Sequence, residues 1–398
     1  MLRSLYAGIS GLRAEQTMLD VTSNNIANVN TVGFKSSSVQ FEDALSQTVS
    51  AAGLSTSAKA GTNPNQVGLG VRVAGITTNL NEGSQTTTGN NLDAMISGDG
   101  YFVTQTGSQT LYTRNGSFHW DAQGRLSTAD GSLVQGWKAA PDGSVSTGGA
   151  PTTLTLPSGT VSPATPTSTA SVTGNLPSDA KPKTVLERDI TVYSGDGTAR
   201  QLTAKFTADD TVAGKWNYTI DDGDPAKAVS GSLQTDGTGA LTSTSTTTPT
   251  VDGIAVDLSA MSGYAGLTTA GFAKQDGNAA GTLLSVAMGG DGTLSGTFSN
   301  GATVAIARLA IGTFTNPEGL AKAGNSTLTS TLNSGPVRLG TAGSDGWGSV
   351  VSGALEASNV DLSAEFTNLI VAQRGFQANA RIITTSDAIL QELIQLKQ

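Results

Sequence analysis

The sequence contains no cysteine and a single histidine, His119, among 398 residues. Disulfide staples, thiolate zinc sites and Cys-His nucleophiles are therefore excluded, and a histidine metal cluster cannot form within this chain. Charged residues make up only 13% of the chain and aromatic residues 5%, whereas glycine is abundant at 50 residues. This composition is typical of many short strands joined by turns rather than of a compact helical enzyme.

Long apolar runs and basic clusters are also missing. No window approaches the roughly 18 apolar residues that a membrane span requires, and MLRSLYAGISGLRAEQ at the start has no uninterrupted apolar core of a secretory signal. The net charge is −9, from 22 Lys and Arg against 31 Asp and Glu. An acidic chain without basic patches lacks the attraction that binds phosphate backbones. We therefore expect no nucleic-acid partner, no membrane insertion, and export, if any, without a cleaved signal peptide.

No set of residues has the spacing of a catalytic or ligand-binding motif. The acidic group Asp221, Asp222 and Asp224 lacks the twelve-residue pattern of a calcium loop and is predicted to be a solvated loop. The glycines of GLGVRVAG lead into a strand-like alternation, whereas a dinucleotide-binding loop would lead into a helix. The sequence therefore predicts no catalytic residue, no cofactor and no metal site, and we expect a protein that is not an enzyme.

The first residues carry an apolar row at helical spacing. A seven-residue repeat is the signature of one helix face that packs along a partner helix. The alternative, an ordinary amphipathic helix packed on its own domain, remains open from this short stretch alone. The row consists of Leu5, Leu12, Leu19 and Ile26, with Ile9 in the alternate position.

The last residues repeat this pattern over a longer span. Asp361, or Asn359 just before it, is a good helix N-cap, so the pattern predicts one helix of roughly 50 Å from about Asp361 to the end. Its apolar stripe is wider than a two-helix seam needs, so we expect more than one helical neighbour. Gly375 inside this helix predicts the close approach of a neighbouring backbone. The row consists of Leu355, Leu362, Leu369, Phe376, Ile383 and Leu390.

The middle of the chain reads as β structure. Residues 67–73 alternate apolar and small or polar side chains, as in a half-buried strand. Asn115-Gly116 and Asp130-Gly131 each predict a hairpin turn between strand-forming flanks. The alternating segments QLTAKF and KWNYTI predict a separate small barrel or sandwich farther along the chain.

With more than 390 residues, the chain should form several domains. The predicted fold class is multidomain α+β, in which paired N- and C-terminal helices form a coiled-coil-like inner domain and two mainly-β domains are inserted between them. The predicted parts are a helical domain of 1–30 with 360–398, a connecting segment of 31–66 with 340–359, an inner β domain of 67–149 with 281–339, and an outer β domain of 150–280.

Two long motifs at opposite ends of the chain carry a family resemblance. SGLRAEQTMLDVTSNNIANVNTVGFK, residues 10–35, resembles the N-terminal signature of the bacterial flagellar rod and hook axial proteins. GALEASNVDLSAEFTNLIVAQRGFQANARIITTSDAILQELI resembles their C-terminal signature. Two such motifs in the right order make a specific match. The chain length and the β-rich insert are similar to the hook members of this family rather than to most rod members.

The resemblance implies a role for the asparagine-rich segment after the first helix. In the family this segment joins the N-terminal helix to the part of the chain that leads outward. Asparagine and glycine tolerate turn conformations, and a phenylalanine can anchor the chain once it has left the helix. A helix end without any role in assembly is the alternative. The implied joint residues are Asn24, Asn25, Asn28, Gly33 and Phe34.

The resemblance further implies a structural subunit that polymerises through its terminal helices into a flexible curved tube, the flagellar hook, which transmits torque to the filament. The implied partners are other copies of the chain, the hook cap, the distal rod, the hook–filament junction proteins and the flagellar type III export apparatus. The implied location is the extracellular hook. A distal rod or other axial component is the first alternative, and a secreted β-rich adhesin or enzyme is the second.

Overall fold

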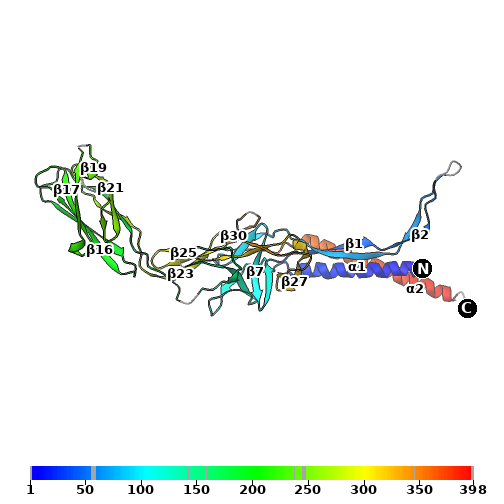
Figure 1. Ribbon diagram of the computed structural model, residues 1–398. Helices are drawn as coiled ribbons and strands as arrows, with labels where there is room; N and C mark the ends of the chain where they lie inside the picture. Colours follow the sequence, from blue (N-terminus) through cyan, green and yellow to red (C-terminus); the bar gives the residue numbers. More distant parts are fainter. Residues whose placement is uncertain are drawn as a thin grey trace.

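A helix stands at each end of the chain, and almost everything between them is β structure. The computed structural model describes residues 2–54, 60–140, 143–156, 159–236, 238–243, 248–344 and 346–395. Helix α1 spans Leu2–Ala27 and helix α2 spans Leu362–Gln395. They pack against each other, antiparallel, at one end of an elongated molecule (Figure 1). The prediction of a largely β chain with paired terminal helices is confirmed, while residues 1 and 396–398 of the predicted helical segments lie outside the described residues.

A long hairpin follows α1 and runs back along the helix pair. Strand β1 (Ser37–Asp43) pairs antiparallel with β4 (Val71–Thr78), and both contact α1. Beyond them β2 (Ser46–Ser50) pairs with β3 (Asn65–Gly68) and projects away from the helices (Figure 1). We refer to these two strands as the arm.

The strand predicted over residues 67–73 differs from the observed one. Gly70 interrupts it with a φ of +118°, and a Cβ at Gly70 would overlap the Ser10 hydroxyl of α1. Only glycine fits this close approach, so the chain bends there. Strand β4 then pairs with β1 beside α1 and has no partner in the central sheet.

A fourteen-stranded sheet forms the body of the molecule. Its buried side chains make two clusters, one around Phe102, Phe118 and Leu154 and one around Tyr112, Trp137 and Phe314. Two small sheets adjoin it: β5 (Gln85–Thr87) pairs with β31 (Ala354–Glu356), and β6 (Ala94–Ser97) with β30 (Ser349–Ser352). The strands of the large sheet are β7 (Tyr101–Thr106), β8 (Gln109–Thr113), β9 (Phe118–Trp120), β10 (Leu126–Thr128), β11 (Leu133–Lys138), β12 (Thr152–Thr153), β13 (Val161–Ser162), β23 (Gly281–Met288), β24 (Thr293–Phe298), β25 (Thr303–Leu309), β26 (Ile311–Thr313), β27 (Ala321–Gly324), β28 (Thr327–Thr329) and β29 (Arg338–Gly340), and a 3-10 turn covers Pro317–Gly319.

Of the two predicted hairpin turns, one is wrong. Strands β8 and β9, on either side of Asn115-Gly116, do not pair, because β8 lies between β7 and β28 while β9 pairs with β10. A Cβ at Gly116 would overlap the Ala94 carbonyl oxygen, so this glycine serves a close backbone approach. At Asp130-Gly131 the expected turn is present, with Gly131 at φ +84° between the paired strands β10 and β11.

Two further sheets share one core at the end of the molecule opposite the helices (Figure 1). The predicted alternations are confirmed there, because Trp216, Tyr218 and Ile220 in one strand and Leu202 and Phe206 in the next are buried. The five-stranded sheet contains β15 (Val185–Tyr193), β16 (Ala199–Ala208), β17 (Lys215–Asp221), β18 (Val229–Thr235) and β19 (Leu241–Ser243), the four-stranded sheet contains β14 (Thr169–Asn175), β20 (Thr250–Val251), β21 (Ile254–Ser262) and β22 (Gly271–Gln275), and a 3-10 turn covers Pro225–Lys227.

The chain enters and leaves this distal part side by side. The incoming strand β13 pairs with the outgoing β23, and Thr165 forms a bridge with Asn278 just beyond them. Thr167 then donates its hydroxyl hydrogen to Gln275 at 3.0 Å. A two-stranded stalk therefore connects the distal sheets to the body.

Candidate assembly surface and helix joint

Helices α1 and α2 meet through small side chains. Gly11 and Ala14 of α1 and Ala372 of α2 are buried in the seam. A Cβ at Gly11 would lie 2.6 Å from the Asn379 side-chain nitrogen, which is closer than packed atoms allow. Glycine at this position therefore lets the two helices approach closely.

The predicted apolar rows fall on the helices with one exception. Leu5, Ile9, Leu12, Leu19 and Ile26 are all half-buried on α1, and Leu369, Ile383 and Leu390 are half-buried on α2. Leu362 and Phe376 remain exposed.

The exception is Leu355, which lies in strand β31 before the helix. Its assignment to the helical row is wrong, because the helix begins only after its N-cap residue, Asp361. The Asp361 carboxylate accepts hydrogen bonds from the amides of Ser363 and Ala364 at 2.8 and 3.3 Å, as an N-cap does. The capping role predicted for Asp361 is thus confirmed.

The close neighbour expected at Gly375 is a side chain rather than a backbone. The Glu15 carboxylate of α1 covers it, and a Cβ at Gly375 would lie 2.5 Å from Glu15 Oε1. Burial raises the pKa of Glu15 above its ordinary value, and its Oε2 has no hydrogen-bond partner.

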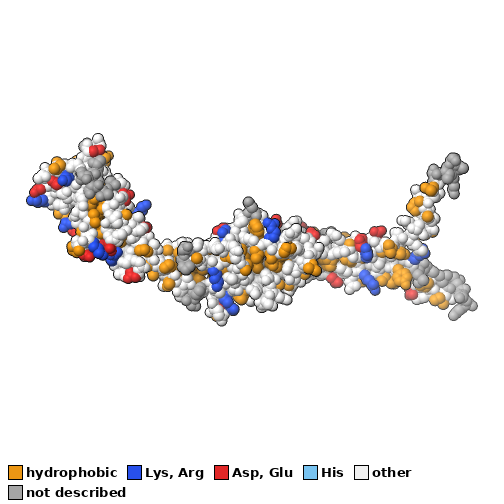
Figure 2. All heavy atoms as spheres, in the orientation of Figure 1, with side chains coloured by type: hydrophobic (Ala, Val, Ile, Leu, Met, Phe, Trp, Pro, Cys, Tyr) orange, Lys and Arg blue, Asp and Glu red, His pale blue; other side chains and the backbone are white. Residues whose placement is uncertain are grey.

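Much of the apolar surface of α2 is left uncovered on both sides of the α1 seam. At 3.6 residues per turn, Phe366 and Ile370 lie on one flank, and Val371, Ile382 and Ile389 lie on the other. Their exposed fractions run from 44% to 55%. Figure 2 shows hydrophobic side chains gathered at this end of the molecule and on the arm. Exposed apolar side chains gathered along one helix make it a candidate interaction site.

The asparagine-rich segment forms the end of α1 and the turn that follows it. The Asn28 amide donates to the carbonyl and side-chain oxygens of Asn24 at 2.9 and 3.1 Å, and its own oxygen accepts from Thr31. Gly33 takes a φ of +68°, and its N–H donates to the Glu356 carbonyl at 2.8 Å. Phe34 follows with its ring 5.2 Å from the Lys322 ammonium.

Asn25 faces the other way and joins three segments. Its side-chain nitrogen donates to the Ser37 carbonyl at 2.7 Å and to the Glu365 carboxylate of α2 at 2.8 Å. Its oxygen accepts from the Ser37 amide at 3.0 Å. One buried side chain therefore ties α1 to the hairpin and to α2.

A buried ion cluster, which the sequence analysis missed, lies directly behind this turn. Glu356 is fully buried, 2.6 Å from the Lys35 ammonium and 3.5 Å from the Arg114 guanidinium. Its carboxylate also accepts from the Gly83 amide at 2.9 Å. Desolvation lowers the pKa of Lys35, against the opposing effect of Glu356. The cluster links the segment after α1, the segment before α2 and the body of the molecule.

Asn359, the alternative helix cap of the sequence analysis, has a different role. Its oxygen accepts from the Ser36 amide at 2.8 Å, and its nitrogen donates to the carbonyls of Asn79 and Asn81. We call this whole region the joint, meaning residues 24–37, 79–83 and 356–361 with Arg114.

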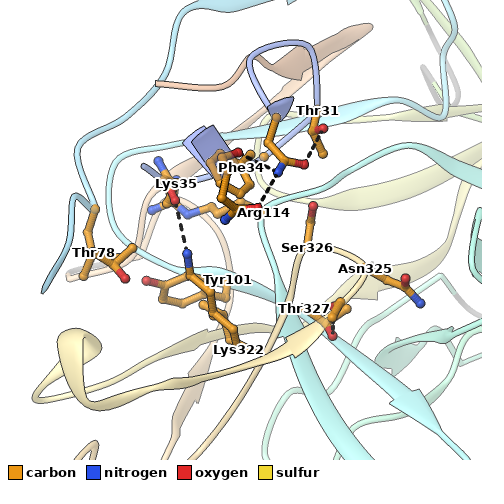
Figure 3. Close-up of a pocket in the computed structure, with 16 residues that line it drawn as sticks. Thr31, Phe34, Lys35, Thr78, Tyr101, Arg114, Lys322, Asn325, Ser326 and Thr327 are labelled. Atoms are coloured by element: carbon orange, nitrogen blue, oxygen red, sulfur yellow. Dashed lines mark hydrogen bonds between the residues drawn. The ribbon is translucent and has the colours of Figure 1, made fainter. Parts of the chain in front are cut away.

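A pocket of about 460 Å³ opens beside the joint (Figure 3). Asn24, Asn28, Gly33 and Phe34 line it, so the structure brings four of the five predicted joint residues to one cavity. The fifth, Asn25, is not among the lining residues.

In the distal part, Asp222 and Asp224 of the acidic group already have partners within the chain. Asp222 pairs with Arg200 at 2.6 Å, and Asp224 caps the 3-10 turn after it. Within the part of the chain that the structure describes, no three His, Cys, Asp or Glu residues converge as metal ligands. In the same residues, neither helix is apolar enough to cross a membrane.

Three family profiles match this chain. Residues 5–35 match "Flagella basal body rod protein", residues 95–173 match "Flagellar hook protein FlgE/F/G D1 domain", and residues 351–396 match "Flagellar basal body rod FlgEFG protein C-terminal". The first and last of these cover most of α1, all of α2, and residues 24–35 and 356–361 of the joint.

Full-length relatives are also found. The chain is 34% identical to the flagellar hook protein FlgE of Borreliella burgdorferi, with all of both chains covered. It is 36% identical to FlgE of Salmonella typhimurium, covering 99% of this chain and 100% of the relative. It is 33% identical to the flagellar basal-body rod protein FlgG of Bacillus subtilis, again with all of both chains covered.

Proposed function

The chain belongs to the flagellar hook protein FlgE family as a structural subunit of the hook, and we propose that its terminal helices drive its assembly into a flexible tube. Proteins of this family are structural components rather than enzymes. The single observation that carries the proposal is the uncovered apolar surface on both flanks of α2. Burying it needs at least two further helices, and neighbouring copies of the chain supply them in a polymer.

The exposed fractions of these side chains give the free energy that one flank can contribute to assembly. Fully burying an apolar side chain contributes roughly 1.5–3 kcal/mol. The flank residues Val371, Ile382 and Ile389 are each about half exposed, so together they contribute about 2–4 kcal/mol per copy. This flank alone corresponds to a dissociation constant no tighter than about 1 mM, so the polymer also needs the contact of the Phe366 and Ile370 flank.

We propose that the β structure folds as two domains stacked outward from the helices. The buried clusters of the body draw on residues 94–154, 286–314 and 320–350, whereas the distal cluster draws only on residues 170–272. Separate cores support separate domains. The joint, together with the hairpin beside the helices, forms the connecting segment, and the helix pair forms a short coiled coil.

Bending of the tube requires each row of copies to shorten and lengthen during every rotation. The distal part of the chain is rich in threonine, serine and glycine and has few aromatic residues, a composition that favours weak and exchangeable contacts. The apolar helices keep their contacts while the outer domains slide, which is a shear motion between rigid units. Asn25 and Glu356 hold the angle between these two layers.

The partners we propose beyond the polymer itself are the hook cap, the distal rod and the hook–filament junction proteins. Each caps or continues the stack of copies at one of its ends. We also propose that the chain leaves the cell through the flagellar type III apparatus. Loss of secretion in a strain that lacks this apparatus tests that route.

The assembly proposal is tested with the triple variant Val371→Gln, Ile382→Gln and Ile389→Gln. We expect the purified wild-type chain to form curved tubes under the electron microscope and the variant to remain monomeric with unchanged circular dichroism. The control Val185→Gln removes an apolar side chain that is half exposed in β15, far from the helices, and should form tubes. Tubes from the triple variant at wild-type concentration would contradict the proposal.

A rod component is the second candidate, because the FlgG relative is covered completely. The same images decide between them. Straight, rigid tubes favour the rod, whereas curved tubes favour the hook.

A further inference from the structure

The two uncovered flanks of α2 carry their apolar side chains at different heights along the helix. At about 100° per residue, one set lies roughly 80–160° to one side of Ala372, which is buried in the seam with α1, and the other lies roughly 80–100° to the opposite side. The exposed fractions of these side chains run from 39% to 55%. The early flank consists of Leu362, Phe366 and Ile370, and the late flank consists of Val371, Ile382 and Ile389.

The difference in height between the flanks follows from the helix rise. The early flank is centred about 15 residues before the late flank, which is roughly 22 Å along the helix. After Ile370, the side of the early flank continues with the exposed polar residues Gln373, Gln377 and Thr384. In two parallel copies that stand level, the apolar part of each flank would therefore face polar side chains.

The charges of α2 are spaced in a similar way. Arg374 and Arg381 are exposed and make no ion pair within the described residues. Acidic residues lie on both sides of them, Glu365 before and Asp387 and Glu392 after. In level copies the arginines of neighbouring helices would stand at the same height and repel each other. A displacement of about 15 residues brings Arg381 of one copy level with Glu365 of the other, and the late acidic residues level with Arg374.

We propose that the early flank of α2 in one copy packs against the late flank of α2 in a neighbouring copy that is displaced by roughly 22 Å along the helix axis. The inference rests on the proposed polymer, in which copies related by rotation about the tube axis and translation along it run in the same direction. The two flanks differ, so the contact is heterologous and continues from copy to copy. Because each contact includes an axial displacement, the copies build a helix rather than a flat ring.

Introduced cysteines report this displacement cleanly, because the chain contains none of its own. The double variant Phe366→Cys with Ile382→Cys places one thiol on each flank, roughly 24 Å apart along one helix, which is too far for a disulfide within the chain. Mild oxidation of its tubes should give a ladder of cross-linked dimers, trimers and longer products on a non-reducing gel. The control Thr384→Cys with Ile382→Cys keeps one thiol on each side but at nearly equal height, and should give no ladder.

The two double variants decide between displaced and level copies. Tubes of the first variant without a ladder, or a ladder from the control, would overturn the displacement while leaving the proposed function intact. Absence of tubes from the wild-type chain would overturn both.

Co-assembly keeps the test decisive if the double variant forms no tubes of its own. The single variants Phe366→Cys and Ile382→Cys are mixed and assembled together with an excess of wild-type chain. The mixture should give cross-linked dimers after oxidation, and either single variant with wild type should give none. Dimers from one single variant alone, or no dimers from the mixture, would overturn the contact.

A charge variant tests the displacement independently. Arg374→Gln with Arg381→Gln should raise the concentration needed for tube formation severalfold at low salt, because acidic residues of the neighbour lose their opposite charges. The control Lys205→Gln with Lys274→Gln makes the same change in net charge at exposed positions of the distal part and should leave this concentration unchanged. A lowered or unchanged concentration for the arginine variant would overturn the displacement, since relief of repulsion is the result expected of level copies.

Discussion

Substituting Glu356 by glutamine should loosen the joint. The carboxylate lies 2.6 Å from the Lys35 ammonium and is fully buried. At an effective dielectric constant near 20 this pair contributes about 6 kcal/mol before desolvation is subtracted. Removing one partner of a buried pair costs about 3–5 kcal/mol, since the remaining charge is left without compensation. Glutamine keeps the shape and one acceptor, so the loss is mainly electrostatic.

Hydrogen exchange of the native monomer measures this loss locally. Two backbone amides report on the joint. The Gly33 amide donates to the backbone carbonyl of Glu356 at 2.8 Å, and the Gly83 amide donates to the Glu356 carboxylate at 2.9 Å. Because tenfold corresponds to about 1.4 kcal/mol, exchange at these amides should accelerate by roughly 100- to 4,000-fold. The exposed carboxylate of Glu187 in β15 provides the control Glu187→Gln, for which no change is expected.

A second substitution, at Lys35, should compensate for the loss of the Glu356 charge. Adding Lys35→Met to Glu356→Gln removes the stranded charge, while Arg114 keeps its bonds to the Ile96 and Gly98 carbonyls at 3.1 and 2.7 Å. The double variant should therefore recover at least half of the lost protection. If the single variant exchanges within threefold of the wild type, the cluster does not hold the joint.

Three further predictions concern other parts of the chain. Gly11→Val should force α1 away from Asn379 and increase amide exchange along both helices, and unchanged exchange would contradict the close helix approach. Asp361→Ala should remove the N-cap and destabilise the first turn of α2 by about 1 kcal/mol, seen as faster exchange confined to that turn, whereas Asp361→Ser should restore protection. Hydrogen bonds from Arg200 and a neighbouring lysine hold the pKa of Asp252 at about 2, below the ordinary 3.8, so the distal sheets should lose stability as pH falls from about 4 to 2. Asp252→Asn should flatten this loss in a tryptophan-fluorescence titration, and an unchanged acid slope would show that other carboxylates cause it.

The helices were predictable because a seven-residue apolar row and a capping aspartate are local signals. The beginning of α2 shows the limit of such rows, since Leu355 continues the spacing by coincidence and lies in a strand. The prediction of a hairpin turn at Asn115-Gly116 was wrong for a different reason. There the backbone packs against Ala94, and this tertiary contact overrides the local preference.

The joint was predictable only in part. Asn24, Asn25, Asn28, Gly33 and Phe34 stand close together in one motif, so their shared location follows from the sequence. The ion cluster behind them does not, because its members come from three distant segments and each is an ordinary charged residue in its own context. Lys35 and Glu356 lie within the two terminal motifs, but nothing in the sequence around either residue indicates that its charge is buried.

The two-stranded stalk that carries the distal sheets has a consequence for how this architecture can change. Its strands are already paired at residues 161–165 and 278–282, so a folded unit spliced between them adds little chain entropy to be overcome. Exchanging that unit for another whose two ends lie close together should leave the helices and the joint undisturbed. In the tube proposed above, the distal sheets can therefore change while the helix pair and the joint stay the same.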